Sequence, residues 1–453
     1  MLKKLIFNRT FTECESEKEE TKEPQKNEKV LIIGSGMLGI TSAYFLSKRG
    51  CEVTVIDKDN PIRGATEQNG NTVTFIPYPA WTTMNVKQVI KDTLTFSSTP
   101  LCYFRLSLLL DSHFRFWVRK YFKNRNSESV KQSNAALARL TKFSISLFDK
   151  FIDDCTENNP DLVEYHFETL HAIYNGLSEK EIQEKRELVE YMNKFEEGTK
   201  LVSPERYDAS FAYNIPLRCF NTGRFVNYMR TRLSEKHGVH FLDGEIKAVT
   251  CSDSQIKSLE YSDSNLETKT LEGFDKYVVC AGIESVNIGK MVGLKVPLMG
   301  FKGYSLNVFV EDKEIPEFSS IRMPETICIS RVGYNTGGMV RVTGFADIDG
   351  NNIDPVPWRK DMLIEMAKKF VGEDAYDESK ASHWVGLRPL CADDVPLIGK
   401  SSKFNNLFWN TGHGPRGITQ SVGSALLLDS LISGHEIPKD LVAEDYNPKR
   451  FDI

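Results

Sequence analysis

The sequence lacks any long apolar run and any strong excess of charge. No run of 18 apolar residues occurs, so no segment predicts a membrane-spanning helix. Lys and Arg number 57 against 62 Asp and Glu, which gives a net charge of −5. Because that balance offers no basic surface for nucleic acid, we expect no nucleic-acid partner. At 453 residues, the chain is long enough for two domains with substantial cores.

Cysteine is present but forms no pattern. The nine cysteines are scattered, include no CxxC pair and lie in no Cys/His cluster. An odd number without regular spacing predicts reduced thiols rather than a disulfide framework. We therefore expect no metal site, and a reducing, cytoplasmic location.

The first 28 residues differ from the rest of the chain. Lys3 and Arg9 precede the first acid, Glu13, but the apolar part between them is too short for a secretory signal. A mitochondrial presequence is the alternative to the cytoplasmic location. Because Glu and Lys dominate 13–28, residues 1–28 are expected to form a disordered charged tail.

A glycine-rich turn near the N-terminus indicates a nucleotide site. Four aliphatic residues, Val30 to Ile33, predict a buried parallel strand. Glycines follow at the spacing GxGxxG: the first permits a tight turn, the second lets backbone approach a pyrophosphate, and the third lets a helix pack on the strand. The amides at the start of the next helix, expected at 40–49, suit an anion. The residues of this first glycine turn are Gly34, Ser35, Gly36, Met37, Leu38 and Gly39.

A second strand and an acid at its end support a dinucleotide site. Residues 51–56 predict a buried strand that ends at Asp57 and is followed by Lys58. Asp57 lies 18 residues after Gly39, about where such folds place an acid on the ribose hydroxyls. An acid there also argues against a 2′-phosphate, and so against NADP. For the glycines alone, the alternative is a tight turn without a ligand.

Two further glycine turns follow buried strands. The strand 277–280 runs into Ala281 and Gly282, which either lie over a pyrophosphate or simply end the strand. The strand 406–410 runs into a second glycine turn, which opens a helix at 418–433. Because a helix start can meet an anion or a polarised carbonyl, turns at opposite ends of the chain predict one large cofactor touched from both ends. The residues of the second glycine turn are Gly412, Gly414, Gly417, Ile418 and Thr419.

Local patterns predict several other elements. The segment 101–123 mixes aromatic and basic residues, which indicates either an amphipathic helix with its aromatics packed inward or a membrane-surface patch. Ser178 and Glu181 form a capping box, which predicts the start of a helix. Alternation over 165–174 predicts a strand pair, and Thr222 is expected to cap a later helix.

The motifs together resemble those of a family of flavoproteins. Beside the first glycine turn, the sequence contains KGYSL at 302–306, GLRP at 386–389, DDVPLIG at 393–399 and NTGHGPRGIT at 410–419. Over 30–436 the chain resembles the FAD-dependent D-amino-acid oxidase/glycine oxidase superfamily, and most closely the small, catalytic subunit of bacterial D-amino-acid dehydrogenases. The resemblance implies an α/β fold: a Rossmann-type FAD-binding domain of the glutathione-reductase kind, with an α+β substrate domain built on an antiparallel sheet.

The resemblance also implies a division into domains and a set of FAD contacts. The FAD-binding domain is expected to combine 29–95, 218–296 and 385–446, and the substrate domain 96–217 and 297–384. The first glycine turn would hold the ADP half of FAD, and the second would lie near O2 of the flavin ring. The other cofactor contacts are expected at Asp57, Lys58, Asn69, Gly70, Ile246, Ala281 and Gly282.

Two residues are expected to act on the substrate. Arg388 matches the arginine of the GLRP motif, which in the family binds the substrate carboxylate. A guanidinium suits that role because it offers a planar fork to both carboxylate oxygens. The alternative for Arg388 is a buried salt bridge. Tyr304 either closes the substrate site or packs within its strand.

The chain departs from the dehydrogenase pattern at two places near the expected active site. The family usually has Thr-Pro-Asp after the RP pair, whereas residues 390–394 here are Leu-Cys-Ala-Asp-Asp. It usually has Gly-Trp-Thr after the GHG turn, whereas this chain has Gly417, Ile418 and Thr419, with Arg416 just before them. We expect these departures to affect which substrate side chain the protein binds more than how it binds the flavin.

The resemblance implies an FAD-dependent amino-acid dehydrogenase or oxidase. The expected reaction is oxidative deamination of an amino acid, most closely a D-amino acid, to a 2-oxo acid and ammonia, with hydride passing from Cα to flavin N5. The alternatives are an oxidoreductase of secondary amines such as sarcosine, glycine or proline, and a non-catalytic subunit that contains FAD. The expected partners are a small amino-acid substrate and an electron acceptor, which is a quinone, oxygen or a partner flavoprotein. Contact with a membrane surface and homo-oligomer formation stay open.

Overall fold

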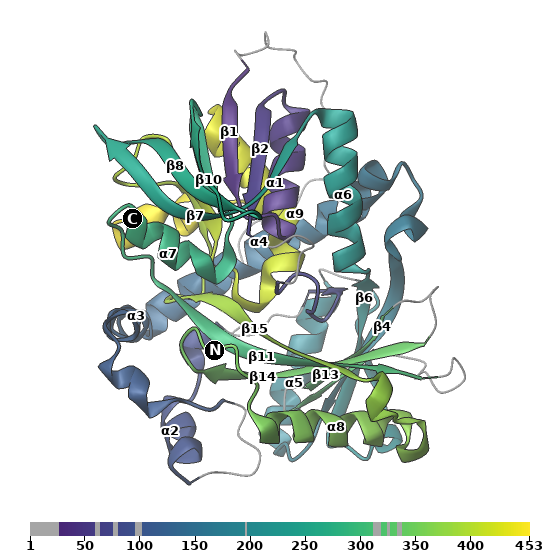
Figure 1. The fold of residues 1–453 in the computed structure, drawn as a ribbon. Helices are drawn as coiled ribbons and strands as arrows, with labels where there is room; N and C mark the ends of the chain where they lie inside the picture. The colour runs from purple at the N-terminus through teal and green to yellow at the C-terminus, as the bar shows by residue number, and fades with distance from the viewer. Residues whose placement is uncertain are drawn as a thin grey trace.

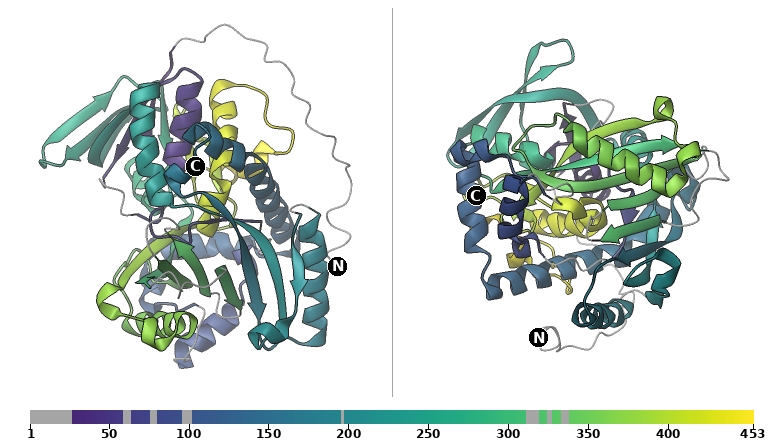
Figure 2. Two further views of the ribbon diagram at one scale, coloured as in Figure 1. Left: turned by 90° about the vertical axis from the view of Figure 1, so that its right-hand side faces the viewer. Right: turned by 90° about the horizontal axis from the view of Figure 1, so that it is seen from below.

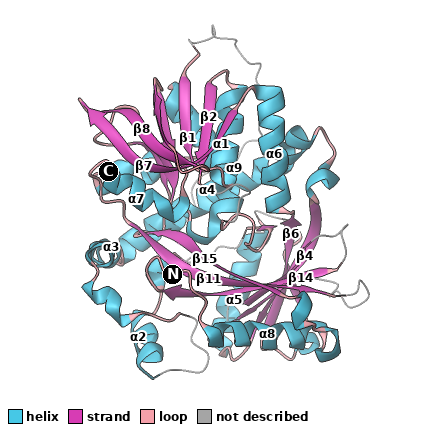
Figure 3. Ribbon diagram, in the orientation of Figure 1, coloured by secondary structure: helices cyan, strands magenta, loops and turns pink. Residues whose placement is uncertain are grey.

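Two β-sheets dominate the molecule. The computed structural model describes residues 27–58, 64–75, 80–95, 102–194, 197–310, 319–323, 327–332 and 338–453. All but the last two residues of the expected disordered tail lie outside these ranges. The first sheet lies in the upper half of Figure 1 and the second in the lower half. Colouring by secondary structure separates the same two layers of strands (Figure 3).

The first sheet has eight strands and is parallel at its centre. Its strands β17, β10, β1, β2 and β7 run parallel to their neighbours, while β16, β8 and β9 extend it in antiparallel fashion. The aliphatic run expected to be a buried strand is β1, at the centre. Across the sheet, the strands are β16 (Leu397–Lys400), β17 (Leu407–Thr411), β10 (Lys276–Val279), β1 (Lys29–Ile33), β2 (Glu52–Asp57), β7 (His240–Ser252), β8 (Gln255–Asp263) and β9 (Thr268–Glu272).

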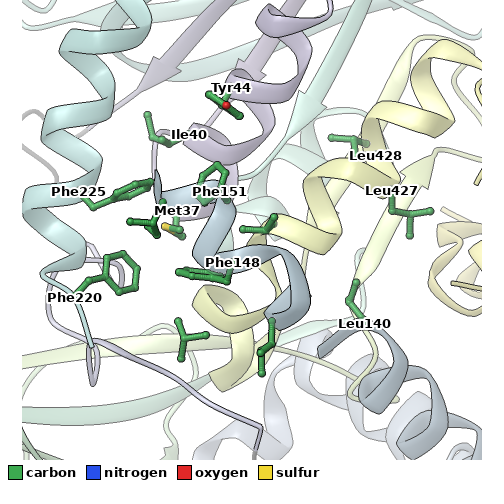
Figure 4. Close-up of a cluster of buried hydrophobic side chains, with 14 of the residues drawn as sticks. Met37, Ile40, Tyr44, Leu140, Phe148, Phe151, Phe220, Phe225, Leu427 and Leu428 are labelled. Atoms are coloured by element: carbon green, nitrogen blue, oxygen red, sulfur yellow. The ribbon is translucent and has the colours of Figure 1, made fainter. Parts of the chain in front are cut away.

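Helices cover both faces of this sheet, because successive residues of β1 enter different cores. Val30 and Ile32 belong to a core shared with α1, α4, α6 and α9, whereas Leu31 and Ile33 belong to one shared with α3 and α7. Figure 4 shows the first of these cores, with Phe148 and other aromatic side chains between the helices. The helices are α1 (Met37–Lys48), α3 (Ser112–Lys123), α4 (Ser127–Thr156), α6 (Thr222–His237), α7 (Ser285–Met291) and α9 (Gly417–Ser433).

The second sheet is antiparallel apart from one parallel pair, β12 with β4. Its outer face packs on α8 (Pro357–Val371), and its inner face turns toward the first sheet (Figure 2). Across the sheet, the strands are β15 (Ser382–Cys391), β11 (Leu298–Phe309), β14 (Met339–Ile348), β13 (Ile327–Val332), β12 (Ser319–Met323), β4 (His166–Tyr174), β6 (Phe211–Cys219) and β3 (Thr72–Val73), with β5 (Lys200–Val202) also paired to β6. The remaining α-helices are α2 (Val86–Thr95), α5 (Glu179–Asn193) and α10 (Ala443–Tyr446).

The expected α/β fold class is confirmed, and local predictions succeed in part. The capping box at Ser178 is present at the start of α5. The expected strand pair at 165–174 is wrong, because β4 is one strand that pairs along its whole length with β6. The expected cap at Thr222 is also wrong: the side chain of Asn221, one residue earlier, accepts the hydrogen bond from the amide of Arg224.

Each sheet is assembled from segments that lie far apart in the sequence. The expected boundary at residue 385 falls within β15, and β3, at 72–73, belongs to the second sheet. The division into an FAD domain and a substrate domain stays a prediction. Among the described residues, no helix has the length and apolar character needed to cross a membrane.

Candidate functional site

The carboxyl ends of four neighbouring strands meet at one edge of the first sheet. The strands β17, β10, β1 and β2 are parallel neighbours, and they end at Thr411, Val279, Ile33 and Asp57 in turn. The hydroxyl of Thr411 donates to the carbonyl of Gly282 at 3.1 Å, which joins the second glycine turn to the end of β10. In open parallel sheets, ligands bind in the crevice at this edge. The structure thus brings together cofactor residues that were expected from distant parts of the sequence.

The first glycine turn is closed to side chains at two of its glycines. Gly34 has φ +108°, and a Cβ there would lie 2.6 Å from the carbonyl oxygen of Cys280. A Cβ on Gly39 would overlap the carbonyl oxygen of Gly34. The α1 helix then starts without a side-chain cap and without an acid in its first turn. The backbone amides and helix dipole therefore favour an anion here, as a pyrophosphate requires.

Asp57 lies at the expected end of β2 and contacts the first glycine turn. Its carboxylate accepts hydrogen bonds from the amide of Ser35 at 2.5 Å and from its hydroxyl at 2.9 Å. Arg230 of α6 donates to the same hydroxyl at 3.1 Å and pairs with Asp243 at 3.3 Å. No sequence pattern pointed to Arg230, because it lies in a helix remote from every motif. Asp57 thus positions the turn as well as lying where a ribose would bind.

Lys58 and Ile246, two other residues expected to contact the cofactor, differ in their exposure to solvent. Lys58 forms an exposed ion pair with Glu284 at 3.3 Å, and this pair links the ends of β2 and β10. Ile246 is buried in β7, within the apolar core that also contains Ile33 and Ile56, and Ala281 packs against that core. Ile246 therefore contributes an apolar wall near the strand ends.

The loop at 64–71 joins the first glycine turn to the second sheet. The hydroxyl of Thr66 accepts a hydrogen bond from the amide of Met37 at 3.1 Å. Asn69 folds back on its own loop, where its side-chain oxygen accepts from the amide of Asn71 at 2.6 Å. From the inner face of β14, Arg341 donates to the carbonyl of Asn69 at 2.7 Å. Motif reasoning missed Thr66 and Arg341, because neither belongs to a recognised pattern.

Gly70 and Asn69 therefore shape the loop from within. A Cβ on Gly70 would meet only the hydroxyl of Thr72, at an ordinary 3.5 Å, so steric crowding does not require glycine there. The expected contact of these two residues with FAD stays a prediction.

The second glycine turn leads into another helix start without a cap. Gly412 and Gly414 have φ +83° and +56°, which side chains rarely adopt. The α9 helix begins at Gly417 with no side-chain cap and no acid in its first turn, and Ile418 and Thr419 are half-buried there. The amides at the start of α9 therefore favour negative charge or a polarised carbonyl.

His413 is buried inside this second turn. Its Nε2 lies 2.8 Å from the hydroxyl of Ser424, and its Nδ1 has no hydrogen-bond partner. Burial lowers the pKa of His413 to about 3, so the ring is neutral near pH 7. A residue with so low a pKa is a poor general base, and His413 acts through its place in the turn.

The residues present fit FAD. Two uncapped helix starts, the glycines that a Cβ would obstruct and the orphaned Nδ1 of His413 lie along one strand edge. Such a row matches an elongated, polar, anionic cofactor touched from both ends.

Arg388 lies on the inner face of β15, over a glycine of the neighbouring strand. A Cβ on Gly303 would be 2.5 Å from Nη1 of Arg388, so only glycine leaves room for the guanidinium. Nη1 also donates to the carbonyl of Phe345 at 2.7 Å. In the described part of the chain, Arg388 forms no ion pair with a carboxylate, so the alternative of a structural salt bridge is not what the geometry shows. Burial lowers the pKa of Arg388 to about 10, which still leaves it charged near pH 7.

Phe345 adopts an unusual backbone conformation beside this arginine. Its φ is +60°, which is a genuine outlier for a bulky residue. The pairing of β11 with β14 shifts register between Lys302 and Tyr304, opposite Phe345. Bulges of this kind redirect backbone groups next to functional sites, and here the redirected carbonyl accepts from Arg388.

Tyr304 is not brought together with Arg388. Its hydroxyl donates to Asp347 at 2.9 Å, and the Asp347 carboxylate is also held by Arg359 of α8. Tyr304 pairs with Val385, and both pack into the core on the outer face. Because successive residues of a strand point to opposite faces, Arg388 and Tyr304 face away from each other. The expectation that Tyr304 closes the substrate site is therefore wrong, and its alternative, packing within the strand, describes it.

The residues that depart from the dehydrogenase pattern form two ion pairs. Asp393 binds Arg450 at 2.7 Å, and Asp394 binds Arg416 at 3.1 Å. Asp394 also accepts from the amide of Trp81 at 2.9 Å. Burial raises the pKa of Asp394, although Arg416 opposes that shift. Arg416 thus anchors the second glycine turn to the segment after β15.

In the described part of the segment 101–123, one face of α3 packs inward, as the amphipathic alternative expects, while Leu109, Leu110 and Phe122 stay exposed. Trp117 and Tyr121 of α3 are buried. The indole of Trp117 donates to the carbonyl of Leu390 at 3.2 Å, and the Tyr121 hydroxyl donates to the carbonyl of Trp81 at 2.9 Å. These bonds support the end of β15 from below.

One group of possible metal ligands occurs among the described residues. His166, Glu168 and Cys219 come within ligand distance of one another on the inner face of the second sheet. The two ring nitrogens of His166 already bond the carbonyl of Glu164 at 2.9 Å and the carboxylate of Glu168 at 3.0 Å, and Ser319 donates to that carboxylate at 2.9 Å. These polar atoms satisfy one another without an ion.

The fold and the site define a class: an α/β protein with a dinucleotide-type cofactor site and, on the second sheet, an arginine that forms no ion pair among the described residues. The family model described as FAD dependent oxidoreductase (DAO) matches residues 29–431. The chain belongs to that family. It is an FAD-dependent oxidoreductase, and FAD is its cofactor, as expected from the sequence.

Individual relatives agree with this placement. The chain is 28% identical to a D-amino acid dehydrogenase of Vibrio atlanticus over 93% of its own length and 99% of the relative. The structure resembles L-proline dehydrogenase from P. horikoshii, with a TM-score of 0.66, 17% identity, and coverage of 94% of this chain and 98% of the other. It also resembles glycine oxidase from Bacillus cereus, with a TM-score of 0.64, 17% identity, and coverage of 90% and 95%. At such identities the solved structures support the fold alone.

Proposed function

We propose that the protein catalyses the FAD-dependent oxidative deamination of an amino acid, most closely a D-amino acid, to a 2-oxo acid and ammonia. The observation that carries the proposal is Arg388, a buried guanidinium without a carboxylate partner between two turns that fit FAD. The D configuration is taken from the name of the Vibrio atlanticus relative.

Arg388 supplies the binding energy for the substrate carboxylate. A guanidinium presents two parallel N–H groups to the two carboxylate oxygens. Each hydrogen bond to a charged group contributes about 1.5–3 kcal/mol. Because the guanidinium rests on Gly303 and is held by the carbonyl of Phe345, it is oriented before the substrate arrives. That orientation fixes the position of the substrate Cα relative to the cofactor edge.

The cofactor carries the redox chemistry, and the protein supplies position and electrostatics. FAD, when bound, would accept a hydride from the Cα–H bond of the substrate while the nitrogen lone pair forms an imine, which water hydrolyses to the 2-oxo acid and ammonia. The residues of the first glycine turn would hold its pyrophosphate, and those of the second would stabilise negative charge on its ring through the α9 amides. Neutral His413 takes no proton in this scheme, since its pKa is about 3.

The test is anaerobic reduction of the bound flavin by amino acids. The purified protein should be yellow and should bleach with an amino acid in the absence of oxygen. Arg388→Ala should keep the colour and lose the bleaching. A matched control is Arg119→Ala, since Arg119 is exposed on α3. A colourless protein, or an Arg388→Ala protein reduced as fast as wild type, would overturn the proposal.

The same experiment separates the alternatives. A panel of sarcosine, glycine and proline beside D- and L-amino acids distinguishes a secondary amine oxidoreductase. A yellow protein that no amine reduces would be a non-catalytic subunit. Reoxidation by air compared with a quinone identifies the electron acceptor. That acceptor, an oligomeric state, a membrane contact and the cytoplasmic or mitochondrial location stay predictions.

A further inference from the structure

Two glycines form a floor between the cofactor-holding turns. Gly303 of β11 lies directly opposite Gly386 of β15. The guanidinium of Arg388 lies over Gly303, where an added Cβ would be 2.5 Å from Nη1. The indole of Trp384 lies over Gly386, where an added Cβ would overlap the ring. Since neither glycine carries a side chain, a cation and an aromatic ring both reach the strand backbone.

The position of this glycine floor is set at both ends of the strands. Toward one end, Asn307 of β11 donates to the side chain of Gln68 at 3.2 Å, which places the 64–71 loop above it. Toward the other end, Leu390 of β15 pairs with His413 of the second glycine turn. The floor therefore lies between the two loops that fit FAD, on the face that turns toward them.

An unsatisfied hydroxyl lies in the same place. Ser305 pairs with Trp384 across β11 and β15, on the inner face. Ser305 is 2% exposed, and its hydroxyl has no hydrogen-bond partner among the described residues. A buried hydroxyl without a partner costs free energy, so this group is explained best by a polar ligand that meets it.

We infer that the glycine floor is the substrate subsite and that it selects α-amino acids with large apolar or aromatic side chains. Arg388 takes the carboxylate, the hydroxyl of Ser305 meets a second polar group, and the indole of Trp384 packs against the substrate side chain. This inference rests on the proposed function and adds the substrate class.

The charges around the floor favour an apolar side chain over a charged one. Arg341 lies on the same face of β14 and is 4% exposed. Its Nε donates to Asn307 at 2.7 Å, and its Nη1 donates to the carbonyls of Glu67 and Asn69. Its charge repels basic side chains, and because Nε and Nη1 already donate within the protein, only Nη2 is left to bond an acidic one. An indole, in contrast, packs well against apolar and aromatic groups.

The first measurement is the rate of anaerobic flavin reduction by the holoenzyme, with both enantiomers of phenylalanine, leucine, alanine and glutamate. We expect phenylalanine and leucine to exceed alanine and glutamate by at least about tenfold in rate over apparent Kd. Trp384→Ala should abolish that preference by slowing the large substrates. His383→Ala is the matched control, because His383 neighbours Trp384 but belongs to the opposite face. A wild-type preference for alanine or glutamate, or an equal effect of Trp384→Ala on all substrates, would overturn the inference.

A second measurement separates this inference from the proposed function. Benzoate and acetate, which cannot be oxidised at an amino group, are titrated against the flavin absorbance of wild type and of Trp384→Ala. We expect benzoate to bind at least about tenfold more tightly than acetate, and only benzoate to weaken in the variant. If no amino acid reduces the flavin but this pattern holds, the proposed function fails and the aromatic subsite stands. If amino acids reduce the flavin and the two acids bind alike, the subsite fails and the proposed function stands.

Discussion

The two faces of the second sheet treat their buried cations in opposite ways. On the outer face, Lys302 pairs with Asp349 and Arg359 pairs with Asp347, and none of the four residues is more than 3% exposed. On the inner face, Arg388 donates only to a backbone carbonyl among the described residues.

The difference teaches how one strand can serve both structure and function. Successive residues of β11 alternate between faces, so Lys302 joins the outer ion pairs while Gly303 forms part of the inner floor. A cation that already has a carboxylate partner holds the fold together. One that lacks such a partner has its charge available for an anionic substrate, which repays part of the cost of its burial.

Removing an acid from the outer face should have the largest effect. Asp347→Ala removes the carboxylate that pairs with the buried Arg359 guanidinium and also removes the bond to Tyr304. We expect the free energy of unfolding to fall by about 3–5 kcal/mol, measured by chemical denaturation of the holoprotein. As a control, Glu378→Ala removes an exposed acid that pairs with Lys360 and should change stability by less than about 1 kcal/mol. Equal effects of the two variants would contradict the role assigned to the outer face.

Removing the unpaired cation should act on activity instead. Arg388→Ala breaks no ion pair, so the denaturation midpoint should stay near that of wild type. Losing one or two charged hydrogen bonds of about 1.5–3 kcal/mol each should lower kcat/KM at least about tenfold, and more if both are lost. Steady-state kinetics beside the same denaturation measurement checks both statements. A large loss of stability with kcat/KM equal to that of wild type would show that Arg388 has a structural role, like Lys302 and Arg359 on the outer face.

Filling the floor should reproduce part of that loss without removing the arginine. In Gly303→Ala the new methyl would lie 2.5 Å from Nη1 of Arg388 and displace the guanidinium. We expect KM to rise by about tenfold, since binding of the carboxylate weakens. Gly64→Ala is the matched control, because a Cβ there would have no neighbour within 4 Å. An unchanged KM in Gly303→Ala would show that the position of the Arg388 guanidinium does not depend on a glycine at 303.

The ion pair of His166 with Glu168 on the inner face should give the smallest effect, and this effect depends on pH. Burial opposes both charges, but hydrogen bonds outweigh it: the pKa of His166 is raised and that of Glu168 is lowered. The raised pKa contributes stability below about pH 6.5 that is lost as pH rises through the folded pKa, and the lowered one contributes stability above about pH 4.5 that is lost as pH falls through its folded pKa. The contribution is therefore greatest between those values and amounts to less than about 1 kcal/mol.

The measurement is the thermal unfolding midpoint of the holoprotein across pH 4–9, for wild type and His166→Gln. The variant should lose the rise in stability toward mildly acidic pH. His171→Gln serves as the control, because burial lowers the pKa of His171. Identical pH profiles of the unfolding midpoint for His166→Gln and wild type would show that this ion pair does not contribute to stability.

Much of the cofactor site follows from sequence spacing. The aliphatic run, the glycines that follow it and the acid at Asp57 lie where the structure has β1, the first glycine turn and the end of β2. These features are local: a turn that needs φ +108° at Gly34 selects glycine whatever the rest of the fold does. Local capping rules also predict the cap at Ser178 correctly. They favour Thr222 wrongly, because the adjacent Asn221 is an equally good capping residue and forms the cap instead.

The substrate side of the site was less predictable. Tyr304 and Gly303 are neighbours in one motif, yet only Gly303 lies beside Arg388. Which face each residue takes depends on the register of β11 with β15 and on the bulge opposite Phe345. Register between strands about 80 residues apart is a tertiary property, and a shift by one residue would exchange the two faces.

By itself, the sequence predicted glycine turns that suit a nucleotide, and an arginine of a family motif for the substrate carboxylate. Only the tertiary structure decided that Arg388 forms no ion pair within the described part of the chain, that Arg341 fastens the 64–71 loop, and that Trp384 and Ser305 share its floor. The physical reason is one of range. A glycine turn is selected by backbone geometry within a few residues, whereas the partner of a buried charge is set by which strands lie side by side.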